Sequence, residues 1–180
     1  MEQTEKKFSG VKDGEVFKAG GIEFIKFPDR DGVTPAVAKD ILFTSAFGED
    51  NNFANSTILE QLQKEVLPQV LEDVGEENVL LFHTDLTTLD GLKPYGELES
   101  RISLPTFDFY RENVEIFDRY NPGTWWWLAT ADSAKPHYDP VWITCVSPRG
   151  GINLDGYYGG RNGVRPFLNF VSSIFGSCEE

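Results

Sequence analysis

Side chains that carry catalysis or bind metal ions are scarce in this sequence. The two histidines, His83 and His137, and the two cysteines, Cys145 and Cys178, are widely spaced. Neither a CxxC nor an HExxH spacing occurs, so the usual ligand sets of a zinc site are missing. A GxSxG nucleophile elbow is also missing, and Cys145 lies in an apolar segment that predicts a buried, unreactive thiol. We therefore expect no catalytic residue, no metal site and no cofactor.

The glycine-rich segment at 156–163, GYYGGRNG, is the candidate for phosphate binding. It lacks the GK[ST] ending of a P-loop and does not precede a helix. We interpret it as a loop before the final strand, containing tyrosine and arginine, which are enriched in binding hot spots. With a second loop it would form a contact rim, made of His137, Tyr138, Tyr157, Tyr158 and Arg161. The alternative is an ordered loop that binds nothing.

Acidic residues dominate the charge of the chain, which is −13 at pH 7. Ten acidic residues and one lysine lie between positions 49 and 90, so this stretch carries a formal charge of −9. Such a negative surface repels nucleic acid and favours a basic protein partner. The candidate partner-binding residues are Glu49, Asp50, Glu65, Glu72, Asp73, Glu76 and Glu77. The alternative is a solvated face that only keeps the protein soluble.

A helix is predicted to carry most of these acids. Apolar residues recur at helical spacing at Ile58, Leu62, Val66 and Val70. Either Thr57, with Glu60 three places on, or Ser56 would cap its start. Pro68 predicts a bend or a second short helix. The acids at 72–77 then follow at the C-terminal end, where they oppose the helix dipole, so stability does not explain them.

The remaining elements predict an α+β domain. A second helix is expected at 107–120, and Thr84 to Gly91 is expected to be a structured loop, because its side chains hydrogen-bond local backbone. Strands are expected at 22–27, 36–43, 79–82, 125–130, 141–146, from 152, and at 163–170. Two helices would pack on this twisted, mainly antiparallel sheet. We expect one domain over 1–180, with flexible ends at 1–13 and 176–180.

No targeting or membrane segment is expected. The first ten residues contain no apolar run, and no stretch approaches the length of a membrane-spanning helix. The sequence therefore predicts a cytoplasmic protein.

Three consecutive tryptophans, Trp125, Trp126 and Trp127, and a closing GVRP at 163–166 make a recognisable pattern. The order WWWLAT, VWITCV, SPRGG and GVRPFLNF resembles small phage- and prophage-associated domains of unknown function, which have a WWLRS-type strand and a terminal GVRP strand. The resemblance implies a fold similar to C-type lectins and formylglycine-generating enzymes, with the chain ends close together. Ala129 stands where that family usually has arginine. The calcium signatures of lectins and the cysteine pair of the oxidases do not occur.

Trp126, Trp127 and Arg165 are interpreted as structural residues. Side chains alternate along a strand, so Trp126 should point to one face and its two neighbours to the other. Arg165 is expected to be buried, bonded to a carboxylate or to backbone carbonyl groups.

Two binding functions follow from these features. The first is a non-enzymatic protein of a phage or mobile element, acting in the cytoplasm of the bacterial host. Its acidic surface would occupy the basic groove of a nucleic-acid-handling defence protein, for example a CRISPR effector nuclease, and it resembles anti-CRISPR proteins in size and charge. The alternative is a lectin-like virion or tail module that binds a host receptor or glycan. Reversing Glu72, Asp73, Glu76 and Glu77 to lysine is expected to abolish partner binding and to leave the melting temperature nearly unchanged.

Overall fold

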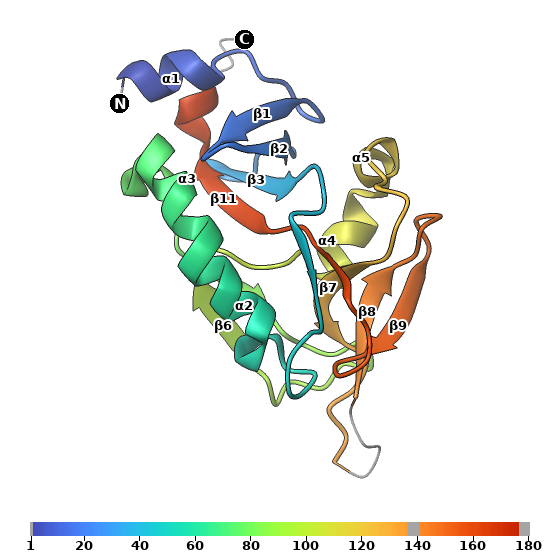
Figure 1. Cartoon of the computed structure of the whole chain (residues 1–180). Coiled ribbons are helices and arrows are strands. Elements are labelled where there is room, and N and C mark those ends of the chain that lie inside the picture. The colour runs from blue at the N-terminus through green and yellow to red at the C-terminus, as the bar shows by residue number, and fades with distance from the viewer. Residues whose placement is uncertain (1, 137–140, 177–180) are drawn as a thin grey trace.

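The first of the two larger β-sheets in the described residues joins early and late parts of the chain. The computed structural model describes residues 2–136 and 141–176. The sheet has the antiparallel order β1-β2-β3-β11, formed by β1 (Val16–Ala19), β2 (Ile22–Lys26), β3 (Val33–Ala38) and β11 (Phe167–Val171). Beside it, helix α1 (Glu2–Phe8) packs against the short 3₁₀ helix η4 (Ser172–Phe175) (Figure 1). Within the segment 1–13, which the sequence predicts to be flexible, residues 2–8 form α1, and Phe8 is buried against Phe17 and Phe175. Positions 177–180 lie outside the described residues.

The second sheet contains the tryptophan strand. Its order is β4-β10-β7-β8-β9, formed by β4 (Phe43–Ser45), β10 (Asn162–Val164), β7 (Trp126–Ala131), β8 (Trp142–Val146) and β9 (Ile152–Gly156). All neighbours are antiparallel except β10 and β7, which are parallel. A separate antiparallel ribbon is made by β5 (Phe82–Asp85) and β6 (Glu97–Ser100). The α+β prediction is confirmed.

Two predicted strands are each divided between the two sheets. The expected strand at 36–43 is shared between β3 and β4, and the expected closing strand at 163–170 is shared between β10 and β11. At the second break, Pro166 has no N–H to donate to a ladder, while its carbonyl accepts a hydrogen bond from the N–H of Ala38. The chain thus crosses from one sheet to the other at two adjacent places.

The long helix runs through three consecutive segments, α2 (Thr57–Gln61), η2 (Leu62–Val66) and α3 (Leu67–Val74). Ser56 is its cap, accepting a hydrogen bond from the N–H of Leu59. The middle segment is a π-helix, in which the N–H of Leu67 donates to the carbonyl of Leu62. This widened turn leads into Pro68, which has no N–H for the helical ladder. Pro68 is therefore accommodated inside a continuous helix.

The second predicted helix is broken into α4 (Phe107–Glu112) and α5 (Val114–Arg119). Thr106 caps α4 by accepting a hydrogen bond from the N–H of Phe109. Asn113 leaves the helical conformation, with φ −125° and ψ 26°, and its amide donates to the carbonyl of Phe109. A side chain that bonds the preceding turn competes with the helix at this point. Short 3₁₀ turns, η1 (Phe53–Asn55) and η3 (Glu76–Asn78), flank the long helix.

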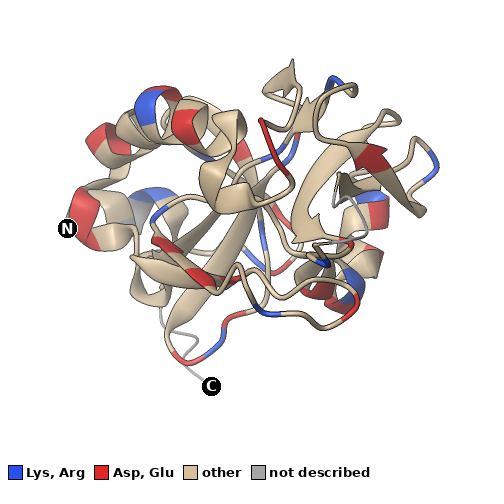
Figure 2. Ribbon diagram, turned by 90° about the horizontal axis from the view of Figure 1, so that it is seen from below, with Lys and Arg blue, Asp and Glu red and all other residues tan. Residues whose placement is uncertain are grey.

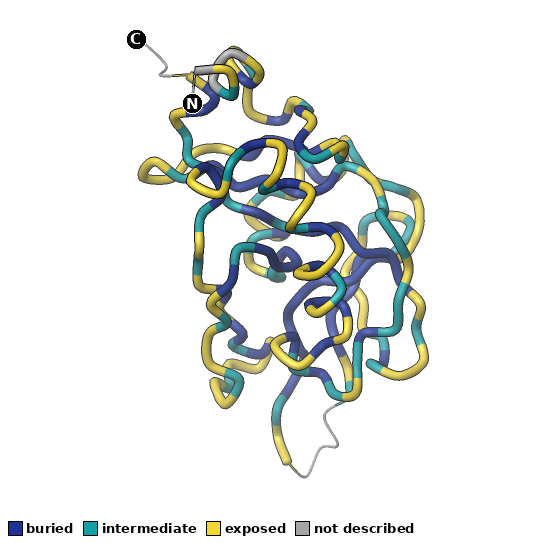
Figure 3. The backbone as a smooth tube through the Cα atoms, turned by 60° about the vertical axis from the view of Figure 1, so that its left-hand side comes forward, coloured by how far each residue is buried: buried dark blue, intermediate teal, exposed yellow. Residues whose placement is uncertain are grey.

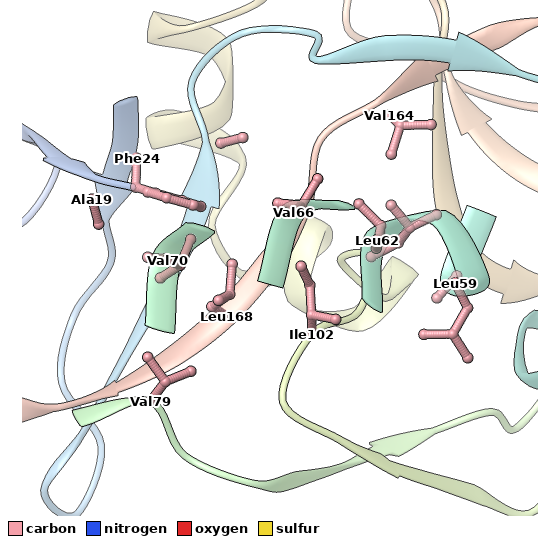
Figure 4. Packing of buried hydrophobic residues seen from close by; sticks show 14 of the residues in the cluster. Ala19, Phe24, Leu59, Leu62, Val66, Val70, Val79, Ile102, Val164 and Leu168 are labelled. Atoms are coloured by element: carbon pink, nitrogen blue, oxygen red, sulfur yellow. The ribbon is translucent and has the colours of Figure 1, made fainter. Parts of the chain in front are cut away.

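Buried residues form two clusters. Figure 3 marks along the backbone which parts of the chain are buried and which are exposed. The larger cluster lies between the long helix and the sheets, where Leu62, Val66 and Val70 meet Ile102 and Leu168 (Figure 4). The smaller contains Trp126, Tyr110 and Phe117. None of the helices in residues 2–136 and 141–176 has the length and apolar character needed to span a lipid bilayer.

Candidate functional site

The seven candidate acids do not form one patch. Glu49 and Asp50 precede the long helix, whereas the residues at 72–77 lie at its far end, and a helix from Thr57 to Val74 spans about 27 Å. Acidic and basic residues both occur on several elements of the molecule (Figure 2). Asp50 stabilises a turn, because its carboxylate accepts hydrogen bonds from the N–H of Asn52 and the amide of Asn55.

Asp73 holds the end of the long helix against the first sheet. Its Oδ2 accepts hydrogen bonds from Lys7 Nζ at 2.7 Å and from the N–H of Gly20 at 2.8 Å. The bond from Lys7, followed by that from Gly20, lowers the pKa of the Asp73 carboxyl group. The interpretation that stability does not explain these acids is thus wrong for Asp73. Reversing all four charges at 72–77 would break this contact, so the melting temperature would also fall.

Replacing Asp73 with alanine is expected to lower the free energy of unfolding by about 1–2 kcal/mol, because it removes a charged acceptor from the Gly20 N–H. The pKa of Asp73 is lowered on folding, so its contribution is complete above the unfolded value and disappears as the pH falls through the folded value. Urea titrations at pH 7 and pH 3 measure both effects. Glu72→Ala, one position away, should change stability by less than about 0.5 kcal/mol.

Four of the other candidate acids are exposed on or near the long helix. Glu76 pairs with Arg101 at 3.4 Å. Glu65 accepts a hydrogen bond from the amide of Gln61. Within the part of the chain that the structure describes, Glu65, Glu72 and Glu77 have no lysine or arginine nitrogen within 4.0 Å. These three carboxylates remain available to a partner.

Of the residues predicted to form the contact rim, Tyr158 and Arg161 are exposed and Tyr157 is half-buried. Tyr158 is 67% exposed and packs edge-to-face on the half-buried Tyr157. Arg161 is exposed and donates to the carbonyl of Thr44 at 3.4 Å. His137 and Tyr138 lie outside the described residues.

Arg165 lies fully buried where the two sheets meet. Its Nε donates to the carbonyl of Ala38 at 2.9 Å and its Nη2 to that of Lys39 at 3.0 Å, with a longer contact to Tyr120. The guanidinium carbon lies 4.6 Å from the ring centroid of Trp126, a cation–π distance. Burial lowers the pKa of Arg165 to about 10, so the group is still protonated at neutral pH.

Trp126 and Trp127 point into opposite clusters. Trp127 belongs to the larger cluster, where its indole N–H donates to the carbonyl of Ser45 at 2.8 Å. Trp126 lies in the smaller cluster, over the guanidinium of Arg165. Trp125 is 39% exposed. The two buried tryptophans thus fill the interior on both faces of β7.

Two adjoining hollows, which the sequence did not reveal, lie between the β5 region and α4. They share Asp85, Thr106 and Asp108 in their linings. The larger, of about 320 Å³, is lined by two acids and two bases together with threonine hydroxyl groups, from Thr87, Thr88, Thr106 and Thr130. Its formal charges balance, because Lys93 and Arg111 accompany Asp85 and Asp108.

The smaller hollow, of about 270 Å³, is more acidic and more aromatic. Its lining includes Asp85, Asp108 and Glu112 against one guanidinium, that of Arg30. Arg30 is bound to Glu112 at 2.7 Å, so its charge is compensated. Three phenylalanines contribute to the lining, and Phe167 meets Phe82 at 5.4 Å and Phe109 at 4.9 Å edge-to-face.

Two polar atoms of residues lining this smaller hollow have no hydrogen-bond partner among residues 2–136 and 141–176. They are Thr84 Oγ1 and Asn169 Oδ1. Alternate residues of a strand share one face, so Thr84 lies on the same side of β5 as Phe82, and Asn169 on the same side of β11 as Phe167. A polar residue two places after a phenylalanine in each strand, Thr84 after Phe82 and Asn169 after Phe167, is the sequence signal that marks the hollow.

Burial raises the pKa of Cys145 to about 12, so its thiol is protonated at neutral pH. Among residues 2–136 and 141–176, no three His, Cys, Asp or Glu side chains come together as metal ligands. Comparison of the chain with protein-family models, curated proteins and solved structures gives no match.

Proposed function

We propose that this chain is a non-enzymatic binding protein of a phage or mobile element, with a C-type-lectin-like fold. It would act in the cytoplasm of the bacterial host and inhibit a nucleic-acid-handling defence protein. The proposed partner carries a basic groove, as a CRISPR effector nuclease does. The observation that carries the proposal is a set of three carboxylates that form no ion pair within the described residues. Glu65 and Glu72 lie on the long helix, whose other face is buried, and Glu77 lies in the turn η3 that follows it.

The long helix supports this role by its rigidity and charge. Its apolar side is fixed in the larger cluster and its end is bound through Asp73, so the backbone that carries Glu65 and Glu72 needs little further ordering on binding. The chain has a net charge of −13, which accelerates encounter with a basic surface at low salt. Glu49 and Glu76 would lie at the margin of the contact, and Asp50 and Asp73 would act by holding the backbone in place.

Neutralising the three glutamates together, as Glu65→Gln, Glu72→Gln and Glu77→Gln, is expected to weaken inhibition of the nuclease at least tenfold. The measurement is the concentration that halves DNA cleavage by a purified effector nuclease, at two salt concentrations. A matched control carries Glu15→Gln, Glu23→Gln and Glu115→Gln, which change the net charge equally on other elements. Equal loss in both triple variants, or no inhibition by the unaltered protein, would contradict the proposal.

Glycan binding is a second candidate, favoured by the larger hollow. Its balanced charges give a neutral ligand no electrostatic disadvantage, and its threonines and half-buried Phe107 suit sugar hydroxyl groups and the apolar face of a ring. A lectin-like virion or tail module would use such a site on a host surface. Micromolar binding on a glycan array, without nuclease inhibition, would establish this function instead.

A further inference from the structure

The smaller hollow has a lining that suits one chemical group. Three carboxylates and one guanidinium line it. Glu112 pairs with Arg30 at 2.7 Å and Asp108 with Arg111 at 2.8 Å, so within the described residues Asp85 is the lining carboxylate without an ion pair, on a chain that is itself strongly negative. Anionic ligands would meet repulsion, and a cation would be attracted. Three phenylalanines add apolar surface and aromatic faces, which bind cations and the aliphatic stems that carry them.

Three residues that line the smaller hollow have oxygen atoms that could accept further hydrogen bonds: Thr84, Asp85 and Asn169. Asp85 Oδ1 accepts hydrogen bonds from the N–H and the hydroxyl group of Thr87, and no bond to Oδ2 is formed within the described residues. Those bonds lower the pKa of Asp85, so the group is a carboxylate at neutral pH. Asn169 Oδ1 is an acceptor without a donor, and Thr84, only 5% exposed, has an unbonded hydroxyl oxygen.

We propose that the smaller hollow is a pocket for an arginine side chain of the basic partner. A guanidinium group presents several N–H donors in one plane and stacks on aromatic rings, whereas an ammonium group is compact and more strongly hydrated. The donors would bond Asp85 and the unpaired oxygens of Thr84 and Asn169, and the side-chain methylenes would contact Phe82 and Phe167. This inference rests on the proposed function, because it specifies how a basic partner is anchored.

The pocket is built on strands and a helix, so it can hold a partner's side chain in a fixed position. Its walls come from β5, α4 and β11, and β11 belongs to the first sheet (Figure 1). Phe167 and Asn169, the lining residues from β11, are held by the pairing of that strand with β3, so this wall is largely formed before a ligand arrives. Pockets of this kind, with an apolar wall and a few fixed polar groups, hold the side chains that dominate binding at interfaces.

The test uses N-acetyl-arginine methylamide as the probe, titrated into the full chain and followed by NMR. Binding is expected in the millimolar range, with shifts of the Phe82, Phe167 and Asn169 signals. The citrulline analogue has the same shape without the charge and should bind at least tenfold more weakly. The lysine analogue should bind at least threefold more weakly. Equal binding of arginine and citrulline, or shifts elsewhere on the molecule, would overturn the inference.

Two substitutions separate the pocket from effects on folding. Thr84→Val keeps the shape and removes an unbonded hydroxyl group, so the melting temperature should not fall. Both Thr84→Val and Asp85→Asn should weaken the arginine probe at least fivefold, while Asp118→Asn, on α5, should leave it unchanged. Unaltered affinity in Thr84→Val and Asp85→Asn would reject the pocket. If the arginine probe does not bind, but the triple glutamate-to-glutamine variant still inhibits the nuclease less than the unaltered protein, only the pocket is rejected. If the probe binds and the unaltered protein inhibits no nuclease, the proposed function is rejected.

Discussion

Replacing Arg165 with alanine is expected to lower the free energy of unfolding by about 3–5 kcal/mol. The substitution removes the donors bound to the carbonyls of Ala38 and Lys39 and opens a cavity beside the ring of Trp126. Those carbonyls lie where the chain passes from one sheet to the other, so the loss affects both sheets. Urea denaturation followed by tryptophan fluorescence measures the change.

Arg161→Ala is the matched control, four positions earlier in the same segment. Arg161 is exposed and makes one long bond to Thr44, so its loss should cost less than about 0.5 kcal/mol. Arg165→Lys should give an intermediate loss, because an ammonium group keeps the charge but not the planar set of donors. A loss below 1 kcal/mol for Arg165→Ala would show that the guanidinium does not hold the sheets together.

Replacing Gly20 with alanine is expected to cost at least about 3 kcal/mol of stability. Gly20 has φ of +60°, a conformation that costs other residues about 1–2 kcal/mol. An added Cβ would lie 2.7 Å from the carbonyl carbon of Gln69 and 2.8 Å from the nitrogen of Val70. Both are backbone atoms of α3, so relief requires moving the helix away from the turn between β1 and β2.

The adjacent Gly21 separates the two causes of this loss. Its φ is +79°, and an added Cβ would have no atom within 4 Å. Gly21→Ala should therefore show only the conformational cost, about 1–2 kcal/mol. Thermal and urea unfolding of the two variants give the comparison. Equal losses would mean that the approach of α3 to Gly20 contributes nothing.

Periodicity predicted the long helix because one face must be apolar to enter the core. Ile58, Leu62, Val66 and Val70 are all buried, as their spacing requires. The sequence allows either Ser56 or Thr57 as the cap of the helix, and in the structure Ser56 is the cap. The π-helical turn before Pro68 was not predictable, because it depends on how the whole helix is held in the core.

The division of two predicted strands between the sheets could not be inferred from local pattern. Charged residues stand at both breaks, Lys39 and Asp40 at the first and Arg165 before Pro166 at the second, but a charged residue within an apolar segment does not by itself say that the chain changes sheet. The break depends on Arg165 binding carbonyl groups more than 120 residues earlier in the chain. Such long-range partners leave no signal in a short window of sequence.

The contacts of the candidate site also depend on residues far apart in the sequence, so they could not be predicted from local pattern. The sequence reveals where the acids are dense, but not that Asp73 bonds Gly20, which is 53 positions away. It likewise cannot show that Phe82 and Thr84 of β5 face Phe167 and Asn169 of β11 across one hollow. Charge content is readable from composition, whereas the pairing of charges and the shape of a pocket depend on tertiary packing.

The pairing of β3 with β11 also constrains how the protein is made. Strands β1, β2 and β3 leave the ribosome early, but their sheet lacks its fourth strand until residues 167–171 have been synthesised. During that interval β3 has an open edge, which can pair with other chains. The ribosome must therefore synthesise the chain as far as residue 171 before the first sheet can be completed. Chaperones that shield strand edges should raise the yield of folded protein.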